Sequence, residues 1–203
     1  MIEIINEMRI LFNGDSITDA GRDRNDVNSL SGYNRIIAEQ LESKNVACFN
    51  RGISGDCSSD LLARIERDLT ETKPDLVSFL IGVNDTWRRY DSCNRITTPA
   101  EYEKNYRAIL SITRQFGAKI IVMEPFLLPV DPAKAIFRED LDFKIDVARS
   151  LAREYAEAYV PLDGLFAEAV LHTLPENFSA DGVHPSENGN RKIAEWWLQR
   201  VKI

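Results

Sequence analysis

Leu76-Val-Ser-Phe-Leu-Ile81 is apolar at almost every position, and the polar segment Gly82-Val-Asn-Asp85 follows it at once. A strand with one face in water alternates apolar and polar residues, so a run that is apolar throughout is typical of a strand covered on both faces. Lys119-Ile-Ile-Val-Met123 has the same character. The two runs therefore predict the interior of a parallel sheet with helices on both sides.

Three further short runs predict the rest of this sheet, and longer segments of helical period separate them. The additional strands expected from β-branched and apolar residues are Arg9 to Phe12, Val46 to Phe49 and Tyr159 to Leu162. Apolar residues at every third or fourth position predict helices over Tyr33 to Ser43, Ser58 to Thr70, Pro99 to Phe116 and Arg138 to Ala158, and a last helix from near Pro185. This alternation implies right-handed crossovers and an α/β fold with a five-stranded parallel sheet.

The bulk composition limits the class of protein. With 203 residues, 44% of them hydrophobic, the chain can form one sizeable core, and we expect a single domain over residues 1–203. The net charge of −7 opposes binding to nucleic acid or to an anionic membrane surface. The start of the chain lacks the basic residues of a signal peptide, and no run reaches the roughly 20 apolar residues of a membrane span. These features predict a cytoplasmic protein.

The cysteines give no sign of a disulfide or metal framework. Cys48, Cys57 and Cys93 are odd in number and show no Cys-x-x-Cys spacing. We therefore expect reduced thiols, no structural zinc site and no cofactor.

Four polar clusters follow strands or precede the last helix, where an open parallel sheet binds its ligands. Gly14-Asp-Ser16 follows the first strand, Asn50-Arg-Gly-Ile-Ser-Gly-Asp56 the second and Gly82-Val-Asn-Asp85 the third, while Asp181-Gly-Val-His184 precedes the last helix. A serine hydroxyl becomes a nucleophile when an imidazole takes its proton, and a carboxylate fixes the tautomer of that imidazole. Ser16, His184 and Asp181 could form such a relay, which predicts hydrolysis of an ester.

Each cluster also has a purely structural interpretation. Gly-Asp-Ser is good turn chemistry, the glycines of the second cluster could serve only as turn residues, and Asn84-Asp85 could cap a helix. His172 has no acid at short spacing, so we interpret it as structural. We expect the carboxylates of Asp15 and Asp85 to accept backbone hydrogen bonds, and Ser54 lacks the Gly-x-Ser-x-Gly pattern of a nucleophile elbow.

The order of the four clusters resembles that of the SGNH hydrolases, also called the GDSL esterase family. The resemblance runs from Ile10-Leu-Phe-Asn-Gly-Asp-Ser-Ile17 to Asp181-Gly-Val-His-Pro185 and so covers nearly the whole chain. It implies a flavodoxin-like three-layer α/β/α sandwich. Asn84-Asp-Thr-Trp-Arg88 and Met123-Glu-Pro-Phe126, with Asp15 to Arg22, are similar to the branch that contains acetylxylan esterases.

The resemblance also implies roles for individual residues. Ser16, His184 and Asp181 match the catalytic triad, and Ser16, Gly55 and Asn84 match the oxyanion hole. The backbone N–H groups of Ser16 and Gly55 and the side-chain amide of Asn84 would be the donors.

Other functions compete with a serine esterase. Asp15, Asn84, Asp85, Asp181 and His184 could ring a divalent cation in a phosphohydrolase, although paired-metal enzymes use more histidines than the two present here. A binding module on the same fold would need no triad.

The substrate is the least determined feature. We expect a short acyl group, with acetylated xylo-oligosaccharides preferred, because the sequence contains no extended apolar lid; acyl thioesterase and lysophospholipase activities occur in the same family. Asp15 and Trp87 are expected near the substrate, Trp87 as a wall for a sugar ring, packed beneath the loop or at a subunit contact. Whether copies of the chain associate is left open.

Overall fold

The computed structural model describes residues 1–203 and contains a five-stranded sheet whose strands are all parallel. The strands lie in the order β3-β2-β4-β5-β6, with bounds β2 Arg9–Gly14, β3 Ala47–Asn50, β4 Leu76–Leu80, β5 Lys119–Met123 and β6 Ala158–Val160. The order is that of flavodoxin-like folds, in which the second strand of the sheet lies outside the first. The predicted fold class is confirmed.

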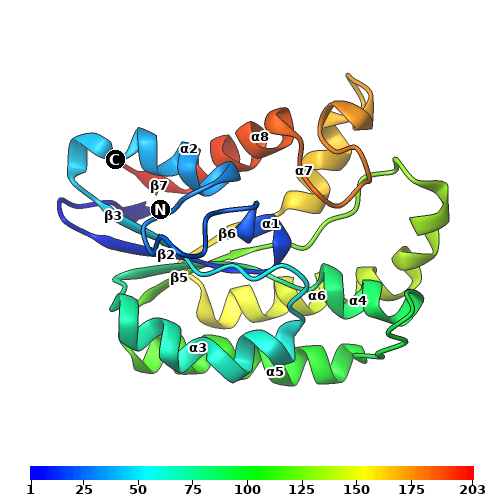
Figure 1. The fold of residues 1–203 in the computed structure, drawn as a ribbon, viewed down its shortest axis with the longest axis horizontal. Helices are drawn as coiled ribbons and strands as arrows, with labels where there is room; N and C mark the ends of the chain where they lie inside the picture. Colours follow the sequence, from blue (N-terminus) through cyan, green and yellow to red (C-terminus); the bar gives the residue numbers. More distant parts are fainter.

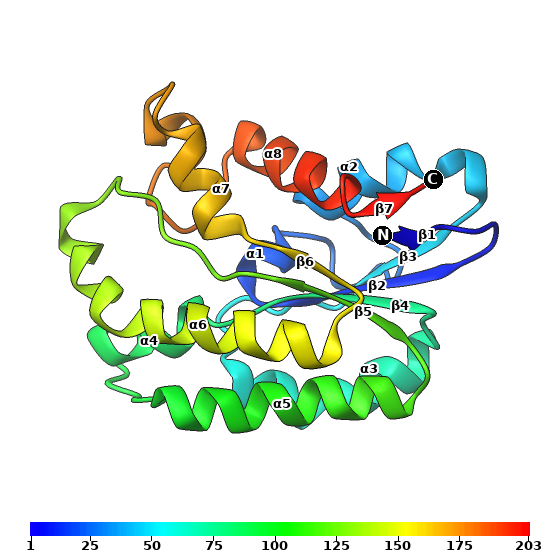
Figure 2. The same ribbon diagram turned by 180° about the vertical axis from the view of Figure 1, so that it is seen from behind.

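Helices cover both faces of this sheet (Figures 1 and 2). On one face, α3 (Ser58–Thr72) packs against α5 (Pro99–Gln115), and α5 packs against α6 (Arg138–Tyr155). On the other face, α2 (Gly32–Gln40) packs against α8 (Glu187–Leu198), with α7 (Leu162–Ala169) beside them. The molecule is thus a three-layer sandwich.

Alternate side chains of the strands enter two separate apolar cores. In β2, Ile10 and Phe12 belong to the core under α2 and α8, whereas Leu11 belongs to the core under α3, α5 and α6. Trp197 of α8 is fully buried against Phe12, and its indole Nε1 donates a hydrogen bond of 3.0 Å to Ser78 Oγ. This bond attaches the last helix to the central strand β4.

The helix boundaries follow from capping residues. The hydroxyl of Thr98 accepts from the backbone N–H of Glu101 at 3.2 Å, and the carboxylate of Glu101 accepts from the N–H of Thr98 at 2.8 Å, a reciprocal pair that begins α5. Pro99 occupies the first turn, and Gly117 follows the end of the helix with φ +84°. The helix predicted over Pro99 to Phe116 is confirmed, one residue shorter at its end.

Several elements differ from the sequence-based expectation. Strand β6 ends at Val160 and α7 begins at Leu162, because Pro161 lacks an N–H and cannot continue the ladder. A short helix α4 (Val83–Tyr90) follows β4 directly, where only a cap was expected. A second sheet pairs β1 (Ile2–Glu3) with β7 (Val201–Lys202) in parallel and holds the two ends of the chain together.

The sheet order changes direction between β2 and β4, because the chain leaves β2 toward β3 on one side and later adds β4, β5 and β6 on the other. Such a switch point opens a crevice beyond the carboxyl ends of the two strands, since their connections turn away to opposite sides. Ser16 follows β2 and Asn84 follows β4. No helix in the structure is long and apolar enough for a membrane span.

Candidate active site

The structure brings Ser16, His184 and Asp181 into one connected chain of contacts. Ser16 Oγ lies 3.0 Å from His184 Nε2, and His184 Nδ1 lies 2.8 Å from Asp181 Oδ2. The serine and the histidine are 168 positions apart in the chain. Each contact has hydrogen-bond length, so a proton can pass from the hydroxyl to the imidazole while the carboxylate holds the opposite ring nitrogen.

The loop before α8 orients its own acid and base. Asp181 Oδ1 accepts hydrogen bonds from the backbone N–H groups of Val183, at 2.9 Å, and His184, at 2.8 Å, which leaves Oδ2 for the imidazole. Gly182 adopts φ +87°, and a Cβ there would lie 2.6 Å from the carbonyl oxygen of Leu128, so the turn requires glycine. Burial opposes ionisation of Asp181, but the hydrogen bonds from His184 and Val183 outweigh it and lower its pKa to about 2. The carboxylate is therefore charged at neutral pH.

The nucleophile candidate stands at the first turn of the short helix α1 (Ser16–Asp19). Asp15 caps this helix, because its Oδ1 accepts from the N–H of Ile17 at 3.0 Å. The expected backbone role of Asp15 is thereby confirmed. Its side chain is buried beneath the turn and is not among the residues that line the cleft, and its expected place near the substrate stays a prediction. Burial, reinforced by the nearby carboxylates Asp85 and Asp56, raises the pKa of Asp15 to about 7.

Gly55 lies at the third position of a tight turn closed by a 3.1 Å hydrogen bond from the N–H of Asp56 to the carbonyl of Ile53. Its φ of +92° is the conformation that a type II turn requires there, which explains the glycine. Asn84 comes from the start of α4, and its Nδ2 donates to the carbonyl of Asp56 at 3.1 Å. An amide nitrogen carries two hydrogens, so Asn84 keeps a second N–H for a ligand.

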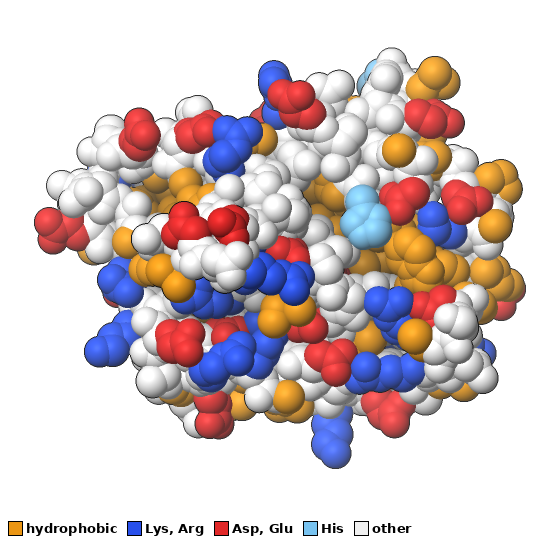
Figure 3. Space-filling view, viewed as in Figure 1, with side chains coloured by type: hydrophobic (Ala, Val, Ile, Leu, Met, Phe, Trp, Pro, Cys, Tyr) orange, Lys and Arg blue, Asp and Glu red, His pale blue; other side chains and the backbone are white.

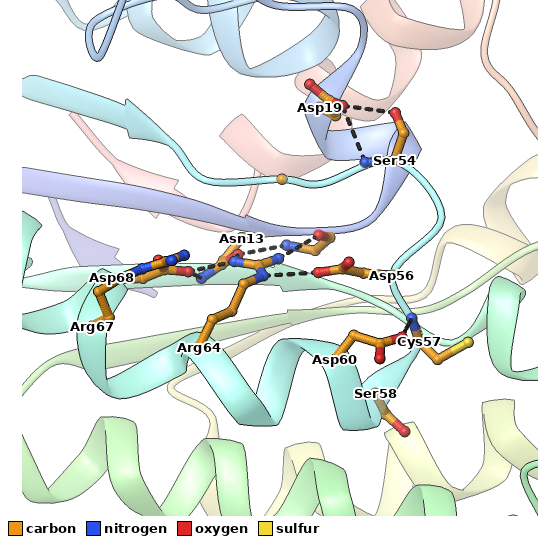
Figure 4. A network of polar contacts seen from close by, with 12 residues as sticks. Asn13, Asp19, Ser54, Asp56, Cys57, Ser58, Asp60, Arg64, Arg67 and Asp68 are labelled. Carbon is orange, nitrogen blue, oxygen red and sulfur yellow. Dashed lines mark hydrogen bonds and ion pairs between the residues drawn. The ribbon is translucent and has the colours of Figure 1, made fainter. Parts of the chain in front are cut away.

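Two charged residues hold the Ser54–Asp56 segment from opposite sides (Figure 4). The carboxylate of Asp19 accepts from both the backbone N–H of Ser54, at 3.1 Å, and its hydroxyl, at 2.7 Å. On the other side, Arg64 donates to Asp56 at 2.8 Å. The hydroxyl of Ser54 is thus engaged as a donor to an acid, which agrees with its exclusion as a nucleophile.

The candidate residues surround one open cleft of about 810 Å³. Ser16, Gly55, Asn84 and His184 all line it, and only four of its 17 lining residues are hydrophobic. Acidic and basic side chains are interspersed over the molecular face drawn in Figure 3, which shows no broad field of one sign. The cleft suits a neutral, polar ligand better than a long aliphatic chain.

Trp87 lines this cleft as well, but its ring is not free on every side. The ring centroid lies 6.0 Å from that of His184 and 5.8 Å from that of Phe137. The ammonium nitrogen of Lys134 lies 4.9 Å from the same centroid, a cation–π distance. Trp87 therefore packs beside the imidazole of His184, and the stacking of a sugar ring against it stays a prediction.

Sequence reasoning missed Lys134, which contacts the candidate triad from the 3₁₀ helix η2 (Pro132–Phe137). Its Nζ donates to the backbone carbonyl of Asp181 at 2.8 Å and lies 3.9 Å from Asp181 Oδ2. The side chain is 13% exposed. No local pattern marks this lysine, because its partner lies 47 positions away.

The residues of the alternative metal ring are used in other ways. The carboxylate of Asp85 accepts from the N–H of Ser58, at 2.9 Å, and from its hydroxyl, at 2.6 Å, so it fixes the start of α3. Burial raises the pKa of Asp85 to about 6, against the effect of these two bonds. No group of three or more His, Cys, Asp or Glu side chains is arranged to hold a metal ion.

A flavodoxin-like sheet with a serine, glycine, asparagine and histidine around the cleft at its switch point defines an SGNH hydrolase. The GDSL-like lipase/acylhydrolase family matches residues 12–192, and the chain belongs to this family. It is accordingly a carboxylic ester hydrolase.

Individual relatives agree with this assignment. The chain is 32% identical over 205 residues to an acetylxylan esterase of Geobacillus stearothermophilus, covering 95% of this chain and 93% of that one. It is 27% identical over 193 residues to thioesterase 1/protease 1/lysophospholipase L1 of Escherichia coli strain K12, covering 95% and 83%. The crystal structure of the Geobacillus esterase superposes with a TM-score of 0.88 at 32% identity over 98% of this chain and 96% of that one.

Proposed function

We propose that the chain is a serine esterase that removes short acyl groups, acetyl above all, from carbohydrate. The observation that carries the proposal is the hydrogen-bonded series Ser16 Oγ, His184 Nε2 and Nδ1, and Asp181 Oδ2. Catalytic mutants of the Geobacillus acetylxylan esterase replace a serine, an aspartate and a histidine, the last two three positions apart, as Asp181 and His184 are. That agreement supports the same roles here.

In the proposed reaction, His184 Nε2 takes the proton of Ser16 as Oγ attacks the acyl carbon. The resulting tetrahedral intermediate collapses when the imidazolium gives this proton to the departing alcohol oxygen, and an acyl-serine remains. Water then attacks the acyl carbon while the same imidazole takes its proton. The bond to Ser16 Oγ breaks, the imidazolium returns the proton to that oxygen, and the carboxylic acid is released. The negative charge of Asp181 stabilises the imidazolium in both halves of the cycle.

The oxyanion that forms in each half needs donors aimed at it. We assign the backbone N–H groups of Ser16 and Gly55 and the second N–H of Asn84 to this task, since all three residues line the cleft. A donor of this kind is worth about 3 to 4 kcal/mol when judged by its removal. These donors carry no net charge, so they interact most strongly with the substrate when the negative charge of the oxyanion forms.

The acetyl and carbohydrate specificity rests on the nature of the cleft. A long acyl chain needs a continuous apolar channel, whereas most residues around this cleft are polar. The acetylxylan esterase relative supports the same choice. An acyl thioesterase or lysophospholipase is the second candidate, favoured by the Escherichia coli relative.

A substrate panel separates the two candidates. Acetylated xylo-oligosaccharides are compared with long-chain p-nitrophenyl esters and acyl-CoA thioesters at equal concentration. The proposal expects kcat/KM at least tenfold higher on the acetylated sugars. A preference for either long-chain class would replace the first candidate with the second.

The serine mechanism itself is tested by Ser16→Ala, which should reduce turnover by at least about a thousandfold, because triad residues act as a unit. Ser43→Ala is the matched control, since that serine is exposed and lies outside the cleft. A phosphonate inhibitor should label residue 16 in a mass-spectrometric peptide map. Label on another residue, or full activity in the alanine variant, would contradict the mechanism.

A further inference from the structure

We infer that Arg64 is a positioning residue that fixes the spacing between the nucleophile turn and the two other oxyanion donors. Arg64 lies on α3, outside the cleft, and nothing in the triad requires it. Its guanidinium nevertheless bonds to the segment that ends in Ser16 and to the segment that contains Gly55. The inference rests on the proposed function, because it assigns these segments to the oxyanion hole.

On the nucleophile side, Arg64 binds the end of strand β2. Nη2 donates to the carbonyl oxygen of Gly14 at 3.0 Å, and Nη1 donates to the side-chain oxygen of Asn13 at 2.7 Å. Gly14 lies directly against β4, where it pairs with Leu80, and a Cβ there would lie 2.0 Å from the carbonyl oxygen of that residue. Arg64 thus binds the backbone two residues before Ser16.

On the other side, Arg64 binds the segment that carries Gly55. Nε donates to Asp56 Oδ2 at 2.8 Å. The backbone of Asp56 closes the turn that aims the N–H of Gly55, and its carbonyl accepts from Nδ2 of Asn84 at 3.1 Å. A displacement of Asp56 would therefore move both donors together.

The guanidinium is held rigidly enough to set a distance. Arg64 is 8% exposed, and the fully buried carboxylate of Asp68 accepts another of its N–H groups (Figure 4). The N–H groups of an arginine project in a fixed planar fork, so its bonds to Gly14 and Asp56 have a defined separation. Lysine offers one ammonium on a flexible stem and cannot hold both segments in this way.

Arg67 provides a matched control on the same helix. It also bonds to Asp68, at 3.0 Å, but its side chain is 59% exposed and its hydrogen bonds reach neither the Gly14 nor the Asp56 segment. Loss of a guanidinium hydrogen bond to Asp68 is therefore common to lysine substitutions at both arginines. Only a change at Arg64 alters the positions of the oxyanion donors.

The test uses Arg64→Lys, Asp56→Ala and the double variant that carries both changes. Arg67→Lys is the control. Arg64→Lys is expected to lower kcat tenfold to a hundredfold on an acetyl ester while KM stays within about twofold, because donor alignment matters most in the transition state. Asp56→Ala should lower kcat similarly, and the double variant should be no slower than the slower single variant, since both remove one connection. Arg67→Lys should retain wild-type kcat.

Binding of a boronic acid that forms a tetrahedral adduct with Ser16 gives an independent readout. Its affinity should fall by the same factor as kcat in the Arg64 and Asp56 variants. If Arg64→Lys does not fold, the pair Asp56→Ala and Asp56→Asn decides, because asparagine keeps an acceptor for Nε and should lose less kcat than alanine. Multiplying effects in the double variant, or equal kcat in the asparagine and alanine variants, would overturn the inference.

Failure of the proposed function has a different signature. If wild-type protein hydrolyses none of the esters, or Ser16→Ala retains activity, the esterase mechanism fails. If the wild type is active and Ser16→Ala is not, but Arg64→Lys keeps wild-type kcat and boronate affinity, only the positioning role of Arg64 fails.

Discussion

Replacement of Lys134 by methionine should raise kcat/KM on an acetyl ester about threefold. The ammonium nitrogen of Lys134 and Nδ1 of His184 approach the same oxygen of Asp181, at 3.9 Å and 2.8 Å, so they are no more than about 7 Å apart. A positive charge at this distance disfavours the imidazolium that forms as Ser16 attacks the acyl carbon. Without it, the transition state should be more stable and the reaction faster.

The size of the rate effect follows from the distance. Two unit charges about 7 Å apart interact by about 0.6 kcal/mol in water and about 2 kcal/mol at an effective dielectric constant of about 20. At about 1.4 kcal/mol per tenfold change in rate, these limits correspond to about threefold and about thirtyfold. His184 is half exposed, with 49% of its side chain accessible, so we expect an increase near the lower limit, about threefold.

Other charges near the imidazole are already paired, so they do not obscure the effect. Arg88 and Glu187 line the same cleft, where Arg88 pairs with Asp91 and Glu187 pairs with Arg191. Lys134 has one further carboxylate beside it, that of Asp131, at 3.3 Å.

The assay is kcat/KM on a soluble acetyl ester at one pH near 8 and at constant ionic strength. Methionine keeps the length of the side chain and its contact with Trp87, while Lys134→Arg keeps the charge and should leave kcat/KM unchanged. Lys192→Met, on the exposed face of α8 and paired with Glu195, is the control. An unchanged kcat/KM in Lys134→Met, or an equal increase in Lys134→Arg, would refute the electrostatic explanation.

Two further substitutions test the oxyanion hole and the buried acid beneath Ser16. Asn84→Ala should reduce kcat about a hundredfold or more with little change in KM, as measured by steady-state kinetics. The surface variant Asn188→Ala is the control. A change in KM alone would contradict the oxyanion role of Asn84. Asp15→Asn retains an N-cap and removes a carboxyl group whose pKa is raised to about 7. Since the folded pKa lies above the unfolded one, wild-type stability declines from about pH 4 to 7, and the variant should gain a few kcal/mol relative to wild type over that range. Urea unfolding at pH 4.5, 6 and 8 measures the gain, and a difference independent of pH would exclude it.

Much of the sheet could be predicted because its central strands, β4 and β5, are short, apolar and almost entirely buried. Strand β5 has the predicted bounds, Lys119–Met123, and β4 is one residue shorter than expected. The helices α3 and α5 agree with the prediction to within two residues, since each has a long apolar stripe and a clear start. Pattern and burial coincide in these elements.

The missed elements lack such a pattern. Helix α4 has eight residues, and its Trp-Arg-Arg-Tyr stretch resembles a surface loop as much as a helix. The two-residue strands β1 and β7 are too short for any alternation and exist only because the chain ends meet. Tertiary contacts decide such segments, and a local pattern cannot show them.

The same distinction applies to the site. Ser16, Asp181 and His184 were predicted to meet because each belongs to a local motif next to a strand or helix end. Lys134 and Arg64 act through bonds to residues in other motifs, as in the bond between Arg64 and Gly14 across 50 positions. Their sequence neighbourhoods are those of ordinary helices, so only the three-dimensional arrangement identifies them.

The separation of Ser16 from His184 has a consequence for biosynthesis. The hydroxyl emerges from the ribosome with the first strand, whereas its base arrives with the final helix, which Trp197 fastens to β4. During synthesis, the proposed nucleophile is therefore present before its proposed base. We expect ester hydrolysis to begin only once α8 has docked against β4, so that activity reports the packing of this helix.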